Sequence, residues 1–461
     1  MNTRKFWKGF GIEMANTFKG GIHVPECKNT KNLPIIELPA PKRVCIPMQQ
    51  HIGAPATPLV KKGEEVCIGQ VIGRFDDGLS CPVHASISGV VADIEMRPSY
   101  TGYGKTAHVI IENDFKNTLC PTIKPYEGNY LSASPEEIIE MVKNAGISGM
   151  GGAAFPTYAK IASAIGKAKD IIINCAECEP YITANYRLML EEPDRIINGA
   201  KILLKAFGVG HAIIAIEDNK LDAAQVLFER LEDNSNIEIS ILKTKYPQGD
   251  ERQLMYAIKG VELPQGKLPA DVGCVIFNAE TCASIYSAVA EGVPLVSRIV
   301  TVDGDAVKQP RNLRIPLGTC YEDIFDFCSG LSEDVAKIIS GGPMMGNAQW
   351  DYRSVVCKNT SAILAFTEKS TYTIAQDASC IHCGRCVSVC PMHLMPNYLA
   401  TFSKAKNDEM CEKFNIMSCV ECGCCTYNCP AGVPIVQHIR NTKTRVVAVK
   451  KKLSEQKQTK A

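Results

Sequence analysis

The chain lacks long apolar runs, a strong net charge and paired histidines, and each absence excludes a class of protein. No apolar stretch approaches the roughly 20 residues that cross a bilayer. The N-terminal MNTRKFWKGFG has neither the apolar core nor the cleavage site of a signal peptide. A formal net charge of +1 over 461 residues gives no field that favours nucleic acid. The eight histidines show no zinc-like spacing. We expect a cytoplasmic protein, or one peripheral on the cytoplasmic face of a membrane.

Cysteine, by contrast, is abundant, with 22 in the chain. A chain of this length without an export signal is not a disulfide-stapled secreted domain, so metal clusters in a reducing compartment explain the count better. Two segments stand out, CIHCGRCVSVCP at 380–391 and CVECGCCTYNCP at 419–430. Both contain C-x2-C-x2-C-x3-C-P, so the metal motif is an internal repeat.

This repeat predicts two [4Fe–4S] clusters in a ferredoxin-like module. Three thiolates on one tight loop bind three irons of a cluster, and the fourth ligand comes from the other copy. One cluster is therefore assigned to Cys380, Cys383, Cys386 and Cys429, and the other to Cys390, Cys419, Cys422 and Cys425. Cys424 is out of register and is left unliganded. The sequence thus indicates an electron-transfer protein.

Zinc is the alternative for these cysteines, but zinc ribbons use two separated C-x2-C knuckles rather than triplets followed by Cys-Pro. A third C-x2-C, formed by Cys175 and Cys178, is flanked by acidic Glu177 and Glu179. Acidic neighbours raise thiol pKa values, which argues against a reactive redox pair. We expect a packing or site-lining role there.

Two patterns of secondary structure precede the cysteine module. Residues 51–95 resemble the two halves of a lipoyl- or biotinyl-type β-domain, but the tip at 83–86 has no lysine to modify, which favours a scaffold. From Ser134, which opens a capping box with Glu137, short apolar runs alternate with helical patterns. The runs are 171–174, 212–216, 237–242 and 274–278, and they predict a buried parallel sheet in a doubly wound α/β domain.

Two loops of this domain carry candidate binding residues. GISGMGGAAFPTYAK (146–160) places four glycines before a helix, and free amides at a helix start favour phosphate, with Lys160 adding a charge. It is neither a Walker loop nor a Rossmann fingerprint, and a plain turn is the alternative. NCAECEP (174–180) follows a predicted strand, at the edge where open α/β sheets bind ligands. Its carboxylates suit ribose hydroxyls or a flavin edge, against the alternative of a solvated loop.

MGGAAFPTYAK, INCAECEPYITANYRLM, YPQGDERQL and FNAET resemble, in order, blocks of the NADH-oxidising flavoprotein subunit of respiratory complex I. That family has GGAGFPTGLK, NADEGEP, a GEE turn and NNVET, and binds FMN with NADH stacked on it. The resemblance implies that the flavin phosphate side is held by Gly149, Gly151, Gly152 and Lys160. It implies that the reacting rings lie against Asn174 and the catalytic candidates Glu177 and Glu179. Gly249, Asp250 and Glu251 match the GEE turn, and Asn278 and Thr281 match NNVET.

The whole order of segments resembles the RnfC family, which belongs to the Rnf ion-translocating electron-transport complex. TFKGGIHVPECK, QHIGAPATPLVKKGE, the glycine block, GGPMMG and the cysteine module all match over about 15–440. The resemblance implies a peripheral subunit that exchanges electrons with NAD(H) through FMN and two [4Fe–4S] clusters. Partner subunits in the membrane would couple electron flow between ferredoxin and NAD to Na+ or H+ movement.

Two other functions stay open. A cobalamin reductase of bacterial microcompartments shares the flavin-like blocks and paired clusters, but the module order here disfavours it. A pure electron-relay or docking subunit is favoured by Ala176, Cys178 and Ala154, which replace an Asp and two glycines of the complex I pattern. The retained glycines, Lys160 and the two glutamates oppose it.

The expected fold class is multidomain α/β, in five parts. These are a domain with a lipoyl-like β barrel-sandwich hybrid (1–130), a doubly wound α/β FMN/NADH-binding domain (131–294), a β-grasp module implied by the resemblance (295–365), an α-helical two-cluster ferredoxin-like module (366–440) and a frayed basic tail (441–461).

Overall fold

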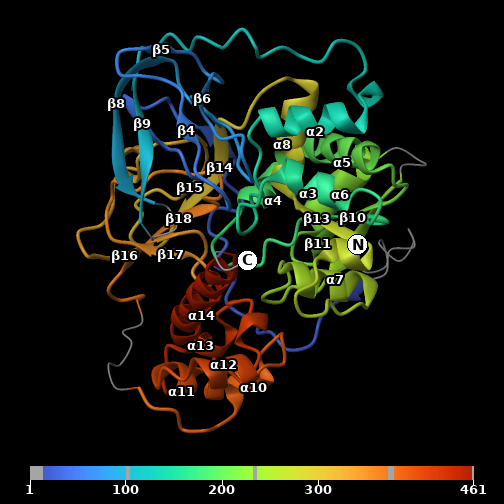
Figure 1. The fold of residues 1–461 in the computed structure, drawn as a ribbon, viewed down its shortest axis with the longest axis vertical. Helices are drawn as coiled ribbons and strands as arrows, with labels where there is room; N and C mark the ends of the chain where they lie inside the picture. The colour runs from blue at the N-terminus through green and yellow to red at the C-terminus, as the bar shows by residue number, and fades with distance from the viewer. Residues whose placement is uncertain (1–13, 100–103, 232–235, 372–377, 459–461) are drawn as a thin grey trace.

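The computed structural model describes residues 14–99, 104–231, 236–371 and 378–458. Figure 1 shows a β-rich part and an α/β part side by side, with a small helical module below them. The basic segment 1–11, which has no signal-peptide pattern, lies outside the described residues. Among those residues, no helix is both long and apolar enough to cross a membrane.

The β-domain is a sandwich of two sheets. Strands pair in the orders β3-β9-β8-β5 and β4-β6-β7, and their inward side chains, Val44, Ile46 and Ile111 among them, form a separate core. The tip at 83–86 is buried, so it displays nothing for a swinging arm, in agreement with a scaffold. The bounds are β3 Arg43–Pro47, β4 Thr57–Pro58, β5 Glu65–Val66, β6 Val71–Arg74, β7 Val83–His84, β8 Gly89–Pro98 and β9 Lys105–Asn113.

The α/β domain contains the predicted parallel sheet, in the order β1-β12-β11-β10-β13. Ser134 and Glu137 form the expected capping box at the start of the first helix. Helices α4 and α7 were not predicted, because their short apolar faces lie among polar residues. The strands are β1 Met14–Asn16, β10 Asp170–Asn174, β11 Ala212–Glu217, β12 Ile237–Leu242 and β13 Cys274–Asn278. The helices are η1 Tyr130–Ser132, α2 Pro135–Asn144, α3 Thr157–Ala164, α4 Ala184–Glu191, α5 Pro193–Phe207, α6 Leu221–Arg230, α7 Glu251–Lys259, η2 Pro269–Val272 and α8 Ala279–Ala290.

Both faces of this sheet are covered, as the apolar runs require. Ile171 and Ile173 of β10 point into the large core with α5 and α8. Ile172, between them, points to the other face, where Leu254 and Met255 of α7 pack. A strand buried on both sides has no polar face, and this explains the continuous apolar sequence IIIN.

The β-grasp part is a mixed sheet in the order β17-β16-β18-β14-β15-β2. Its edge strand β2 comes from the N-terminal segment, and β1 from the same segment joins the α/β sheet. The N-terminal segment therefore pairs with two sheets that sequence separation gave no reason to connect. The bounds are β2 Ile35–Glu37, β14 Ser297–Asp303, β15 Arg311–Pro316, α9 Tyr321–Phe327, β16 Val335–Ser340, β17 Asn347–Gln349 and β18 Ala362–Thr367.

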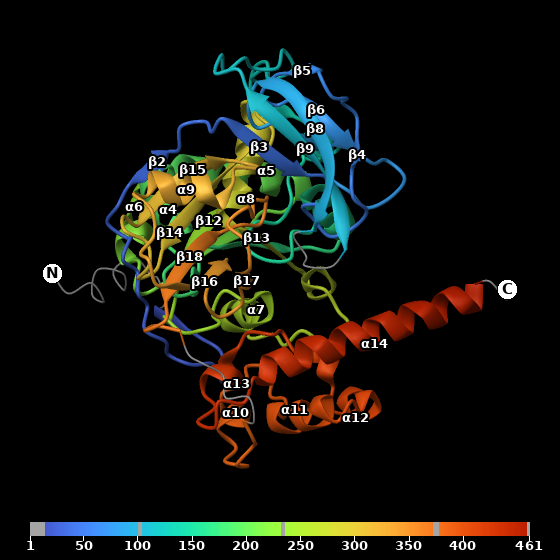
Figure 2. The same cartoon turned by 90° about the vertical axis from the view of Figure 1, so that its left-hand side faces the viewer.

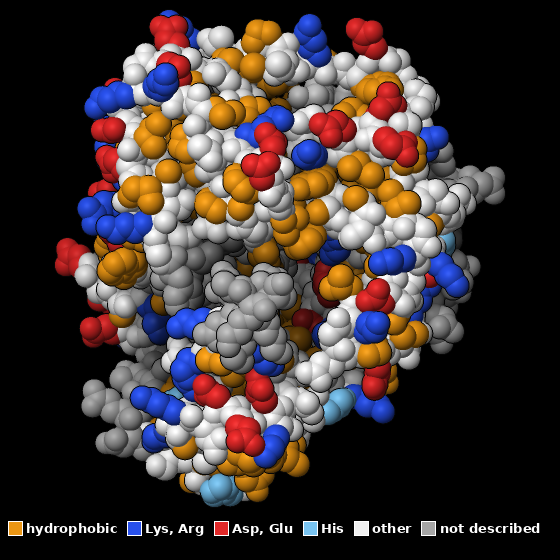
Figure 3. All heavy atoms as spheres, in the orientation of Figure 1, with side chains coloured by type: hydrophobic (Ala, Val, Ile, Leu, Met, Phe, Trp, Pro, Cys, Tyr) orange, Lys and Arg blue, Asp and Glu red, His pale blue; other side chains and the backbone are white. Residues whose placement is uncertain are grey.

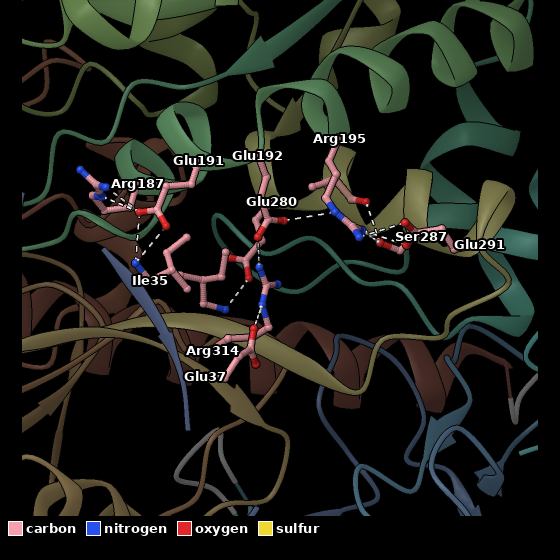
Figure 4. A network of polar contacts seen from close by, with 12 residues as sticks. Ile35, Glu37, Arg187, Glu191, Glu192, Arg195, Glu280, Ser287, Glu291 and Arg314 are labelled. Atoms are coloured by element: carbon pink, nitrogen blue, oxygen red, sulfur yellow. Dashed lines mark hydrogen bonds and ion pairs between the residues drawn. The ribbon is translucent and has the colours of Figure 1, made fainter. Parts of the chain in front are cut away.

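Ion pairs join the α/β and β-grasp parts (Figure 4). Arg314 of β15 pairs with Glu192, at the start of α5, and with Glu37 of β2. Deeper, the side chains of Arg298 and Glu280 are 1% and 7% exposed and pair at 2.6 Å. Such a buried pair fixes the two parts relative to each other, because separating it would leave an unpaired charge inside the protein.

The cysteine module is helical, and its last helix corrects the expectation of a frayed tail. Residues 441–458 continue α14, which projects beyond the module in Figure 2. Arg445 pairs with Asp408, and Lys450 pairs with Glu412. The basic residues are therefore partly neutralised by α12, which the tail sequence alone does not contain. The bounds are α10 Arg385–Ser388, α11 Pro396–Lys404, α12 Asp408–Lys413, η3 Ile416–Ser418, α13 Cys424–Tyr427 and α14 Ile435–Gln458.

Candidate functional site

The candidate flavin site lies at the point where the order of the parallel strands reverses. The chain runs outward from β10 to β11 and β12, then returns to place β13 on the other side of β10. The loops after β10 and β13 consequently diverge, which opens a crevice at the carboxyl edge of the sheet. Asn174 and Asn278 end these two strands and are register partners. Two of the predicted site residues thus flank the crevice.

The glycine loop reaches the β13 side of this crevice. The Met150 amide donates to the Thr281 hydroxyl at 3.1 Å. A Cβ on Gly151 would lie 3.0 Å from the Asn278 side chain, whereas one on Gly152 would meet nothing within 4 Å. Gly151 and Gly152 are exposed, and no side chain caps the N-terminus of α3. An exposed glycine backbone before an uncapped helix fits a phosphate group.

The turn before α7 closes the other side. The Asn174 amide donates to the Gly249 carbonyl at 2.8 Å, and the Gly249 amide donates to the Cys178 sulfur at 3.3 Å. Asp250 caps α7, and Glu251 pairs with Lys160 at 2.6 Å. The predicted residues of four separate blocks therefore converge at one edge. Gly249 has no room for a side chain, because a Cβ would lie 2.5 Å from the Ala176 carbonyl.

The carboxylates of Glu177 and Glu179 are engaged within the protein. Glu177 is buried and accepts from the backbone amides of Asn185 and Tyr186, at 2.8 and 3.2 Å, at the start of α4. Glu179 accepts from the amides of Met344 and Met345, in the GGPMMG loop, at 3.1 and 2.8 Å. Both carboxylates hold loop 174–180 in place, and their contact with nicotinamide or flavin stays a prediction.

Lys28 is a site residue that the sequence did not single out. Its ammonium donates to the carbonyls of Glu177, Glu179 and Ile182 at 2.8, 2.8 and 2.6 Å. Burial and nearby Lys220 lower the pKa of Lys28, and Glu177 opposes that shift. Its only sequence signal was its place in the N-terminal block HVPECK. Lys28 stabilises the loop by satisfying carbonyls that would otherwise be unpaired.

Glu179 gives this loop a pH dependence that can be measured. Burial raises the pKa of Glu179 from 4.5 to about 7, against the effect of the Met344 and Met345 amides. Between these values the folded chain binds more protons than the unfolded chain, so the Glu179 contribution to stability falls as pH rises. We expect the thermal midpoint of Glu179→Gln, relative to the parent, to rise between pH 4.5 and 7. Glu127→Gln, at an exposed carboxylate, is the control, and a constant difference would contradict the assignment.

The eight predicted cluster ligands line two hollows, one for each set. Within the lining residues, one hollow contains Cys380, Cys383, Cys386 and Cys429, and the other contains Cys390, Cys419, Cys422 and Cys425. Backbone amides donate to the sulfurs of Cys380, Cys390 and Cys419 at 3.4 Å. In the described part of the chain, no three His, Cys, Asp or Glu side chains converge as for a single metal ion. Cubane thiolates each bind a different iron, so the donor sets fit two clusters.

The two hollows differ in their surroundings. The Cys390 and Cys422 set lies against the α/β domain, where Gln253 of α7 donates to the Met392 sulfur at 3.3 Å. Gly20 also packs on Cys390, since a Cβ there would lie 2.7 Å from its carbonyl oxygen. At the other hollow, Cys383 is exposed and Ile381 is 64% exposed. Figure 3 shows apolar side chains on the helical module and both charge signs mixed over the rest of this face.

Comparisons with known proteins agree with this layout. Family models match at residues 16–116 (RnfC barrel sandwich hybrid domain), 142–287 (Nuo51 FMN-binding domain), 299–348 (SLBB domain) and 379–433 (4Fe-4S dicluster domain). The RnfC-type subunit of the Na(+)-translocating ferredoxin:NAD(+) oxidoreductase complex of Acetobacterium woodii is 45% identical, over 95% of this chain and 98% of that protein. The corresponding subunit of the proton-translocating ferredoxin:NAD(+) oxidoreductase complex of Clostridium ljungdahlii is 44% identical, over 94% of each.

A solved structure of an NAD+-reducing [NiFe]-hydrogenase in the H2-reduced state is a looser match. It is 17% identical, with a TM-score of 0.48, over 68% of this chain and 62% of that chain.

The fold and the site define an electron-transfer subunit that combines an FMN-binding α/β domain with a two-cluster iron–sulfur module. The chain belongs to the RnfC family of ion-translocating ferredoxin:NAD(+) oxidoreductase complexes. The predicted fold class is confirmed by the four matched domains. Family membership leaves the cobalamin reductase alternative without support.

Proposed function

We propose that this chain is the subunit through which the complex exchanges electrons with NAD(H). The observation that supports this most is the convergence of the glycine loop, Asn174, the Gly249 turn and Asn278 at the reversal point of the sheet. The FMN-binding family model spans the same loops. FMN, when bound, converts the two-electron chemistry of NADH into single-electron transfers.

The residues of the chain divide the work of holding the two cofactors. The exposed glycines and the uncapped α3 suit the flavin phosphate, and Lys160 supplies a cation beside it. Asn174 and Asn278 fix the loops that would border the flavin ring. Glu177, Glu179 and Lys28 maintain the shape of loop 174–180 by satisfying its backbone groups.

The two iron–sulfur sites serve different sides of the molecule. The set containing Cys390 and Cys422 would hold a cluster next to the α/β domain. The set containing Cys383 would hold a cluster near the surface, where a partner has access. A module with one inner and one outer cluster suits a relay, because it joins the flavin domain to the outside of the chain.

Partners supply what the chain does not contain. We propose that it lies peripherally on the cytoplasmic face of the cell membrane, bound to the other subunits of the complex. Ferredoxin would reach it indirectly, through those subunits. The relatives are named for Na+ and for protons, and either ion would move through the partner subunits.

NADH should bleach the flavin and iron–sulfur absorbance of the isolated chain, loaded with both clusters and FMN, under anaerobic conditions. Lys160→Ala should weaken FMN binding about tenfold, because a cation beside an exposed phosphate contributes about 1 kcal/mol. Lys143→Ala is the matched control, since Lys143 also lies over an aromatic ring, that of Tyr158, but on α2. Titration of apoprotein with FMN, followed by flavin fluorescence, measures the affinity.

A relay subunit without its own NADH site is the second candidate. Ala176 and the internal hydrogen bonds of Glu177 and Glu179 favour it. An unchanged spectrum after NADH addition, from protein shown to contain FMN and both clusters, would select this candidate. The flavin would then receive electrons from a neighbouring subunit.

A further inference from the structure

Tyr246 connects the candidate flavin site with the inner cysteine loop. The side chain is 1% exposed, and its hydroxyl donates to the Cys422 carbonyl at 2.7 Å. The same hydroxyl lies beside the Glu179 carboxylate and helps to hold down the pKa of that group. One phenol therefore faces an acceptor on loop 174–180 and an acceptor on the cysteine loop.

The backbone around Tyr246 holds the ring firmly in this position. Tyr246 and Ile22 exchange two backbone hydrogen bonds, both 2.9 Å long. The Cys424 thiol donates to the Tyr246 carbonyl at 3.9 Å. Ile22, Tyr246, Cys422 and Cys424 form a small buried cluster of their own, with Cys178 and Met344 packed against it. The phenol consequently lies in a dry contact between the two modules.

We propose that Tyr246 is a positioning residue whose hydroxyl fixes the Cys422 loop against the flavin domain and sets the reduction potential of the inner cluster. This rests on the assignment of that cluster to Cys390, Cys419, Cys422 and Cys425. Reduction adds negative charge to a cluster, and nearby hydrogen-bond donors stabilise the reduced form. A hydroxyl hydrogen directed at the backbone of a ligand residue is such a donor, so its removal lowers the potential.

Tyr246→Phe tests this with the ring packing preserved. The variant and the parent, each loaded with both clusters, are titrated with dithionite and redox mediators and followed by EPR. Variants that lose one cluster, Cys383→Ala and Cys425→Ala, assign the two signals beforehand. We expect the midpoint potential of the inner cluster to fall while that of the outer cluster stays unchanged. The titration uses neither NADH nor FMN, so failure of the proposed function would not affect it.

Tyr321→Phe is the matched control. Tyr321 is also 1% exposed, and its hydroxyl bonds to Ser340 at 2.9 Å in the β-grasp part, away from the cysteines. It should leave both potentials unchanged. Unaltered potentials in Tyr246→Phe would overturn the proposal. Equal shifts of both clusters, or a loss of iron and sulfide in this variant, would overturn it as well, because Tyr246 would then support only the fold of the module.

Discussion

Cys425→Ala should lose one of the two clusters, and with it half of the protein's iron, whereas Cys424→Ala should keep both. The two residues are neighbours on α13, with exposed fractions of 7% and 0%, so the pair is matched in burial and in the volume removed. Only Cys425 is in register with the C-x2-C-x2-C-x3-C pattern. Iron and sulfide analysis of reconstituted protein measures the difference.

Cys424 makes this comparison demanding, because it lines the same hollow as the inner ligands. Its thiol already donates to the Tyr246 carbonyl at 3.9 Å, which points it toward the α/β domain. The reverse result, iron loss in Cys424→Ala and full iron in Cys425→Ala, would show that the ligand register is wrong. Full iron in both variants would show that either thiol serves as the ligand.

Glu280→Gln should lower the stability of the chain far more than replacement of an exposed carboxylate. It leaves the guanidinium of Arg298, 1% exposed, without a counter-charge, and uncompensated buried charges cost about 3–5 kcal/mol. Glu280 also accepts from the Ile299 amide at 2.8 Å, and Arg298 donates to the Lys358 carbonyl. The loss therefore acts on both sides of the contact between the α/β and β-grasp parts. The thermal midpoint of the folded chain measures it.

Glu37→Gln is the control for this second prediction. Glu37 pairs with Arg314 across the same two parts, but its side chain is 75% exposed. Exposed pairs contribute about 0–1 kcal/mol, so the midpoint should hardly change. Equal midpoints for Glu280→Gln and Glu37→Gln would contradict the importance of the buried pair. Since Glu280 adjoins Asn278 and Thr281, weaker FMN binding should accompany the loss of stability.

Much of the architecture was predictable because its signals are local. The cysteine spacing identifies the ligand sets by covalent geometry alone, and Ser134 with Glu137 marks the start of a helix within four residues. Runs such as IIIN and CVIFN predict buried strands, since only a strand covered on both faces is apolar throughout. The frayed tail was wrong for the opposite reason, because Asp408 and Glu412, which neutralise α14, lie in another helix.

The sequence by itself therefore determined the donor sets, the main strands and the order of the modules, all encoded within short stretches of chain. Only the tertiary structure decided where the carboxylates of Glu177 and Glu179 point, and that Lys28 secures their loop. It alone placed the Tyr246 hydroxyl on Cys422, 176 residues further along. These features depend on contacts between segments far apart in the chain. No periodicity or spacing records such contacts, because folding brings the segments together through cores that many different sequences could fill.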